Sequence, residues 1–172
     1  MLTYYRDALY PSCNQTLTDT IIDMQLLSQI TTRVRLYTSD CNQTALALEA
    51  IKQTKTNVKV LAAIYVAEKD DVGYRRQKTA LQQALQTYGT DNVLGIIVGN
   101  EFMLNYATTH NATSANSTVG LAASAILKAK IADIRQMLTS MNITLPVGTS
   151  EAGSFFNVDL LGAVDFGCAF IT

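Results

Sequence analysis

The residues best suited to do chemistry are Asn100 and Glu101, which close the stretch Val98-Gly99-Asn100-Glu101. They follow the uncharged run Leu94-Gly95-Ile96-Ile97, which is typical of a strand buried on both faces of a parallel sheet. In parallel α/β proteins the reacting groups lie where such strands end. A carboxylic acid beside a hydrogen-bonding amide is what protonation of a departing sugar oxygen requires. Position alone does not separate this role of Glu101 from that of a helix cap.

Composition excludes several other classes of function. The chain has 172 residues, enough for one domain with a sizeable core, and its net charge is −1. The largest basic cluster is Arg75-Arg76, so a nucleic-acid partner is not expected. No apolar run approaches the roughly 18 residues of a membrane span. The single histidine, His110, is expected at the surface among Thr and Asn, which excludes a multi-histidine metal site, and no cofactor is expected.

Helix and strand patterns alternate along the chain, which predicts a parallel α/β sheet with right-handed crossovers. The competing architectures are an open doubly wound sheet and a stretch of a (β/α)8 barrel. No glycine-rich phosphate-binding loop supports the first, and six strands in 172 residues suit a barrel without its last two units. Strands are predicted at 2–5, 33–37, 58–66, 94–101, 145–149 and 164–171, helices from Thr16 and Thr44 and around 81–88 and 127–138, and a polar loop from 101 to 116.

Glycosylation signals indicate an oxidising, secretory environment. Of five N-x-S/T sequons, four are expected to carry sugar, whereas Asn42 adjoins Cys41 and is not. In that environment Cys13 and Cys41 could pair, Cys168 is predicted to be a buried thiol, and three reduced cysteines stay possible. No secretion signal opens the chain, so both ends are expected to be cut from a longer protein. The four sequons are those of Asn14, Asn111, Asn116 and Asn142.

Several motifs, taken in order, resemble glycoside hydrolase family 17, most closely its fungal cell-wall β-1,3-glucanases and glucanosyltransferases. The first are Arg35-Leu36-Tyr37 and Asp40-Cys41-Asn42, and Val98-Gly99-Asn100-Glu101 comes two strands later. The stretches from Gly148 to Gly153 and from Asp165 to Ala169 look like the fifth and sixth strands of that family.

This resemblance implies an incomplete (β/α)8 TIM barrel, with strands one to six present and strands seven and eight missing, as one partial domain over residues 1–172. Glu101 would be the proton donor, and Asn100 would hydrogen-bond the sugar hydroxyl beside the reacting carbon. Arg35 and Tyr37 would lie under the glucose ring, although Arg35 could instead form a structural ion pair. The resemblance also implies a disulfide between Cys13 and Cys41, the pair found in fungal members.

The chain also departs from the family pattern. The nucleophile motif, Glu followed by Ser or Thr, Gly, Trp and Pro, is absent, and the chain has no tryptophan. Glu151 lies only 50 residues after Glu101, in what matches the fifth strand, so we expect it to line the cleft and contact substrate. Phe170 stands where the family commonly has a substrate-contacting Asn.

The resulting hypothesis is a secreted cell-wall glycoprotein that hydrolyses or transfers β-1,3-glucan with retention of configuration. The 172 residues alone are expected to be inactive, since Glu101 would lack its partner carboxylate. One alternative is a non-catalytic glucan-binding or wall-structural protein that has kept the cleft. Another is a small open-sheet binding domain, which a strand order of 2-1-3-4-5 would support.

Overall fold

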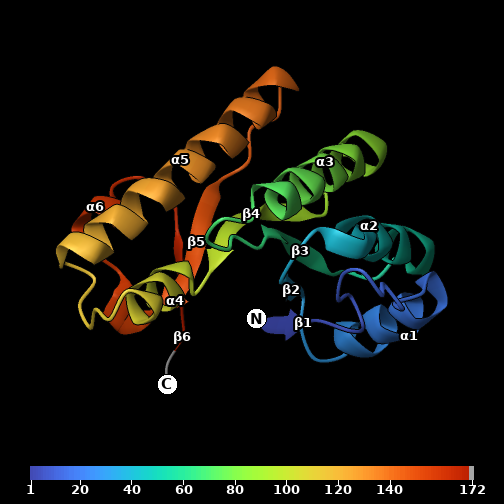
Figure 1. Cartoon of the computed structure of the whole chain (residues 1–172). Helices are drawn as coiled ribbons and strands as arrows, with labels where there is room; N and C mark the ends of the chain where they lie inside the picture. The colour runs from blue at the N-terminus through green and yellow to red at the C-terminus, as the bar shows by residue number, and fades with distance from the viewer. Residues whose placement is uncertain (171–172) are drawn as a thin grey trace. The chain divides into compact units, whose positions relative to one another are not determined.

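The computed structural model describes residues 1–170 and shows parallel strands alternating with helices, as predicted (Figure 1). All six predicted strands are present. The strands are β1 (Leu2–Tyr4), β2 (Arg33–Leu36), β3 (Lys59–Ile64), β4 (Val93–Asn100), β5 (Val147–Ala152) and β6 (Gly167–Phe170). The helices are α1 (Leu17–Ser28), α2 (Gln43–Thr54), α3 (Asp71–Tyr88), α4 (Phe102–Thr109), α5 (Thr118–Ser140) and α6 (Val158–Leu161), with 3-10 turns η1 (Asp40–Asn42) and η2 (Gly153–Phe155).

The strand order in the sheet is β1-β2-β3-β4-β5-β6, the same as the order in the chain. A doubly wound sheet would instead reverse direction at a switch point. The sequential order, with a helix after nearly every strand, is that of six units of a (β/α) barrel, and the open-sheet alternative is wrong. By its contacts the chain divides into two compact units, Met1–Tyr65 with Asp71–Gly95, and Val66–Asp70 with Ile96–Thr172. We describe each unit separately.

The first unit contains β1, β2, β3 and the start of β4. Its α1 begins at the predicted Thr16, whose hydroxyl accepts a hydrogen bond from the Asp19 backbone N–H. Alternate residues of β2 and β3 point into a core of aliphatic side chains, among them Val34 and Val60, which are fully buried. Gly89 ends α3 in the left-handed conformation, with φ +70°.

The second unit contains the rest of β4, then β5, β6 and their helices. The apolar stripe predicted for α5 is buried, and the helix begins with Ser117 as its cap. The polar loop predicted between Glu101 and Asn116 is wrong for residues 102–109, which form α4. Its Phe102 and Met103 are buried, but the Thr- and Asn-rich sequence that follows them obscured the apolar face.

Two smaller predictions are also corrected. Cys168 lies outside the disulfide as predicted, but it is half-buried, because β6 is last in the described sheet and has a neighbouring strand on one side only. The strand expected at 164–171 begins at Gly167. Its predicted end, Ile171, lies outside the described residues, and so does the Phe170 side chain. Among residues 1–170 no helix is long and apolar enough to cross a membrane.

Candidate active site

The five residues expected to bind or cleave substrate all lie at carboxyl ends of strands. In the first unit, Arg35 is in β2 and Tyr37 directly follows it. In the second unit, Asn100 is the last residue of β4, Glu101 follows it, and Glu151 is in β5. Since the pairings of β1 with β2, β2 with β3, β4 with β5 and β5 with β6 are parallel, each group has the position in its unit that reacting groups take in this class of fold.

Gly99 explains why the motif before Glu101 needs a glycine. Its φ is +91°, and an added Cβ would lie 2.9 Å from Leu127 Cδ1 and 3.3 Å from Thr149 Oγ1. The register between β4 and β5 shifts between Ile97 and Asn100, as it does at a β-bulge. Bulges of this kind redirect the side chains that follow them. Gly99 therefore sets the direction in which Asn100 and Glu101 leave the strand.

The backbone of Glu101 is held in an uncommon conformation. Its φ and ψ are 54° and 30°, the left-handed region, which costs a non-glycine residue about 1–2 kcal/mol. The Glu101 N–H donates to the Ser150 carbonyl at 2.8 Å, and the Glu101 carbonyl accepts from the Asn105 N–H at 2.9 Å. Its side chain is partly exposed and makes no capping hydrogen bond to α4, although Glu101 occupies the cap position. Glu101 therefore occupies the cap position, but its carboxylate does not cap the helix.

The cap of α4 is supplied by Glu151 from the neighbouring strand. One carboxylate oxygen, Oε2, accepts from the Met103 backbone N–H at 3.0 Å. The other, Oε1, accepts from the Thr149 hydroxyl at 3.2 Å. The side chain is fully buried. Glu151 thus accepts a hydrogen bond from a backbone amide in the first turn of α4 and holds the start of this helix, next to Glu101, against β5.

The surroundings of Glu151 extend the pH range in which it keeps its proton. Burial raises the pKa of Glu151 to about 7, mainly by desolvation of the charge. Hydrogen bonds from the Met103 amide, the Thr149 hydroxyl and the Phe102 amide oppose this shift, and the nearby charge of Glu101 adds to it. The expected contact of Glu151 with substrate stays a prediction. The geometry favours a positioning role instead.

In the first unit, Arg35 and Tyr37 lie together. The Arg35 guanidinium carbon is 4.8 Å from the centre of the Tyr37 ring, within cation–π range, and Arg35 is buried. Tyr37 also contacts Tyr5 edge to face, with ring centres 5.8 Å apart. The structure therefore brings this predicted pair together and adds Tyr5 to it.

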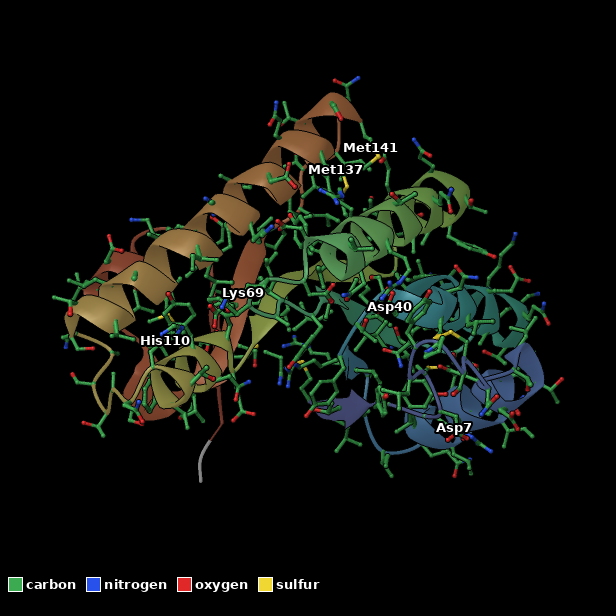
Figure 2. All side chains as sticks on the ribbon, viewed as in Figure 1. Asp7, Asp40, Lys69, His110, Met137 and Met141 are labelled. Atoms are coloured by element: carbon green, nitrogen blue, oxygen red, sulfur yellow. A yellow bond between two sulfur atoms is a disulfide. The ribbon has the colours of Figure 1, made fainter. Side chains whose placement is uncertain are left out.

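The implied disulfide between Cys13 and Cys41 is present, with a Cα–Cα distance of 5.0 Å. Beside it, Asp40 accepts two hydrogen bonds from Arg76, at 2.7 and 2.9 Å, and the Arg76 guanidinium lies 3.5 Å from the Tyr10 ring centre. Asp40 is labelled in Figure 2, near a disulfide drawn in yellow. These contacts fasten the loop before α1 to the turn that follows β2.

Gln77 of α3 is a site-supporting residue that the sequence analysis missed. Its Oε1 accepts from the Thr38 hydroxyl at 2.7 Å and from the Tyr65 N–H at 2.8 Å, and its Nε2 donates to the Tyr65 carbonyl at 3.1 Å. It is buried. A signal was available, because Gln77 continues the apolar stripe of Leu81 and Leu85 at helical spacing, and a polar residue there needs partners.

His110 is exposed, as predicted, and ends α4 (Figure 2). Its Nε2 lies 3.1 Å from a carboxylate oxygen of Glu68, and its ring stacks on Tyr106 at 4.3 Å. Among residues 1–170 no group of three or more His, Cys, Asp or Glu side chains is arranged to hold a metal ion.

Comparison with known proteins identifies the family. The sequence profile described as the BtgE/BtgC glycoside hydrolase domain matches residues 2–171. The chain belongs to this family. The resemblance drawn from the Arg-Leu-Tyr and Val-Gly-Asn-Glu motifs is thereby confirmed.

Curated relatives of this BtgE/BtgC domain are considerably longer. An Aspergillus niger protein named btgC, assigned as a glucan endo-1,3-beta-glucosidase, is 32% identical over 162 residues. The match covers 91% of this chain but 22% of that protein. A glucan 1,3-beta-glucosidase of Schizosaccharomyces pombe is 30% identical over 136 residues, which cover 78% of this chain and 37% of that protein.

Solved structures share the fold of the BtgE/BtgC domain. A Rhizomucor miehei β-1,3-glucanosyltransferase, solved as an active-site mutant with laminaritriose, matches with a TM-score of 0.69 at 22% identity. That match covers 96% of this chain and 54% of the other. An endo-laminarinase from Formosa gives a TM-score of 0.69 at 16% identity, over 96% and 48% of the two chains.

Proposed function

We propose that this BtgE/BtgC domain acts on β-1,3-glucan, by hydrolysis or by glucanosyl transfer with retention, and that Glu101 is its general acid and base. The observation that supports this proposal is that the carboxylates of Glu101 and Glu151 have different surroundings. Glu151 caps α4, so the partly exposed Glu101 carboxylate at the end of β4 is not needed as a cap. The names of the relatives support the substrate class.

In the proposed reaction Glu101 first acts as an acid. Its carboxyl proton passes to the departing glucosyl oxygen while the bond from that oxygen to the anomeric carbon breaks. The resulting carboxylate then takes a proton from water, in hydrolysis, or from an acceptor sugar hydroxyl, in transfer. The adjacent Asn100 amide would bind the hydroxyl next to the reacting carbon. In the first unit, Arg35 and Tyr37 would contact a glucosyl residue of the chain.

Retention also requires a carboxylate that attacks the anomeric carbon, about 5 Å from the acid. Glu151 is poorly suited to this step. It is fully buried, and both of its oxygens accept hydrogen bonds from the protein. The same observation supports the second candidate function, a glucan-binding protein without turnover.

We further propose that the protein is secreted, fungal and glycosylated, and that it acts at the cell wall. Support comes from the disulfide, which is typical of oxidising compartments, and from the fungal source of the curated relatives named above. All five sequon asparagines are exposed: Asn14, Asn42, Asn111, Asn116 and Asn142.

The test begins with the transcript. Its reading frame is determined on both sides of the 172 codons, and the encoded protein is expressed and assayed on laminarin. A downstream Glu-Ser/Thr-Gly-Trp-Pro segment supports the enzyme. Glu101→Gln should then lower kcat by about 10²–10⁴-fold and leave laminarin binding within a few-fold.

Glu68→Gln, which changes a glutamate paired with His110, is the matched control and should keep its activity. Turnover that survives Glu101→Gln contradicts the proposal. Laminarin binding without any turnover in the unsubstituted protein establishes the glucan-binding alternative. Trapping of a glucosyl group on Glu151 would show that Glu151 is the nucleophile.

A further inference from the structure

The strands of the first unit begin at the end of the sheet opposite to Tyr37. Because β1, β2 and β3 are parallel neighbours, their first residues lie side by side. The turn from α2 into β3 lies at this same end, since the helix returns the chain to the start of the next strand. Among the described residues of this unit, these elements place four basic side chains there. We call them the amino-end surface: Arg33, Lys52, Lys55 and Lys59.

Two members of the amino-end surface are direct neighbours in the sheet. Arg33 of β2 and Lys59 of β3 are register partners, so their Cα atoms lie about 4.8 Å apart. Their side chains point to the same face, just as the buried register partners Val34 and Val60 both point to the other face. Like charges in such positions repel one another and destabilise the sheet. The pair is therefore unfavourable unless an anion lies beside it.

The turn before β3 adds two more cations. Lys55 caps the carboxyl end of α2 and comes four residues before Lys59, and Lys52 is in the last turn of the helix. The helix dipole accounts for cations at this position, but it does not account for Arg33 and Lys59. All four basic side chains are exposed. Within residues 1–170, Arg33, Lys55 and Lys59 form no ion pair with an acidic side chain.

Acidic side chains are fewer at this end of the first unit. Glu49 of α2 and Asp91, two residues before β4, belong to segments that end or begin here. Glu49 already accepts a hydrogen bond from the side chain of Gln53 at 2.6 Å. The amino-end surface is therefore locally positive, although the net charge of the whole chain is −1.

The chemistry of the amino-end surface suits an anionic polymer. One phosphate or carboxylate group can contact the Arg33 guanidinium and the Lys59 ammonium together, because the two residues are adjacent. Further anionic groups along the same polymer would reach Lys55 and Lys52. The disulfide of this unit is typical of an oxidising compartment, which favours an anionic polysaccharide over a nucleic acid.

An anionic lipid bilayer fits this surface less well, because it would also need exposed apolar side chains beside the cations. The exposed apolar residues of α1 and of the turn after it are Ile22, Leu26 and Ile30. They recur every four residues, so they run along the side of the helix over about 12 Å. Only Ile30 lies at the end that carries the amino-end surface. A flat bilayer in contact with the four cations would therefore leave most of this stripe in water.

We propose that the amino-end surface binds an anionic polysaccharide, one that carries phosphate or carboxylate groups. Binding would relieve the repulsion between Arg33 and Lys59. It would also leave the opposite end of β2, with Tyr37, free for a neutral glucan chain. The proposal requires no chemistry at Glu101, so it stands or falls independently of the proposed function.

The experiment measures the Kd of the 172-residue chain for phosphate-substituted dextran, carboxymethyl-dextran and uncharged dextran by isothermal titration. Both anionic dextrans should bind, and uncharged dextran should not. Sodium chloride should weaken the binding, because salt screens exposed charges. Arg33→Gln and Lys59→Gln should each raise Kd roughly fivefold, the upper range for one exposed charge pair.

Arg75→Gln is the matched control. Arg75 is an exposed cation near the start of α3, a helix that begins at the opposite end of the unit. This substitution changes the net charge by the same amount and should leave Kd unchanged. Circular dichroism identifies any variant that fails to fold, and Lys55→Gln then replaces it.

Several results would overturn the proposal. These are the absence of binding to both anionic dextrans, an unchanged Kd in folded Arg33→Gln and Lys59→Gln, and an equal loss of affinity in Arg75→Gln, which would show an effect of net charge alone. Tighter binding of a DNA oligonucleotide than of either dextran would identify a nucleic-acid surface instead. Binding to phosphatidylserine vesicles that is lost in Ile30→Ser, without binding to the dextrans, would identify a bilayer surface instead.

Discussion

The carboxylate of Glu151 lies 3.0 Å from the backbone nitrogen of Met103 and accepts its hydrogen bond, although 48 positions separate the two residues. This contact joins β5 to the first turn of α4. It replaces the local side-chain cap that most helices take from their own N-terminal residue. The carboxylate of the neighbouring Glu101 is therefore not needed to cap α4. The two carboxylates differ in burial and in hydrogen bonding.

Glu151→Gln should remove a pH dependence of stability. The pKa of Glu151 rises from 4.5 to about 7 on folding, so the native state retains a proton that the unfolded chain has lost between these values. Stability therefore falls as pH rises from 4.5 to 7, by at most on the order of 3 kcal/mol, and then levels off. Urea unfolding at pH 5, 6, 7 and 8 should show this slope in the unsubstituted chain and lose it in Glu151→Gln. Equal slopes in the two proteins would contradict the assignment.

Thr149→Val should raise the pKa of Glu151 further. The Thr149 hydroxyl donates to Oε1 and favours the ionised form, so its loss leaves the charge less stabilised. Thr149 is fully buried, and we expect a cost of about 1–2 kcal/mol in the free energy of unfolding as well. Thr149→Ser keeps the donor and is the control. Carbon-13 NMR of the glutamate carboxyls measures the titration, and an unchanged midpoint in Thr149→Val would disprove the effect.

Gly99→Ala should be more damaging than Gly89→Ala. Both glycines have positive φ, at +91° and +70°, so both substitutions introduce backbone strain of about 1 kcal/mol. Only at Gly99 does a new Cβ meet neighbours, Leu127 at 2.9 Å and Thr149 at 3.3 Å, whereas nothing lies within 4 Å at Gly89. We expect an additional loss of roughly 1–3 kcal/mol from this crowding. Thermal unfolding of the two variants makes the comparison, and equal losses would refute the packing argument.

Replacement of Cys13 and Cys41 by serine should lower stability by up to about 3.5 kcal/mol. The bond joins residues 28 positions apart, and its loss returns conformational entropy to the unfolded chain. Cys168→Ser, which leaves the disulfide intact, is the control. Thermal unfolding with and without reductant gives the measurement. If reductant lowers the Tm of the double serine variant as much as that of the unsubstituted chain, the effect does not come from this disulfide.

Glycosylation should differ between the sequons when the protein is made in a secreting fungal host. Occupancy is expected at Asn14, Asn111, Asn116 and Asn142. Asn42 should stay unmodified, because it adjoins the disulfide and the threonine of its sequon, Thr44, is buried. The Thr44 hydroxyl is also hydrogen-bonded to the Ser39 hydroxyl, with 3.0 Å between the two oxygens. Glycopeptide mass spectrometry reads each position separately. A glycan on Asn42, or bare asparagines at all the other sites, would contradict the prediction.

Local sequence patterns were sufficient to predict the six strands and the position of Asn100 and Glu101. The apolar run before Val98 predicts a buried strand from neighbouring residues alone, without information about distant parts of the chain. The helix cap at Thr16 and the stop at Gly89 are equally local, and both were predicted correctly. Motif order was sufficient to indicate the family, because each motif follows one strand end.

The hydrogen bonds of the second carboxylate, Glu151, became visible only in the three-dimensional structure. The sequence analysis assigned Glu151 to the substrate cleft because the stretch from Gly148 to Gly153 resembles the fifth strand of the family. Its burial, its contact with Met103 and its bond from Thr149 depend on how β5 lies against α4, which no local pattern encodes. The adjacency of Arg33 and Lys59 likewise depends on strand register, which is set by packing between residues far apart in the chain.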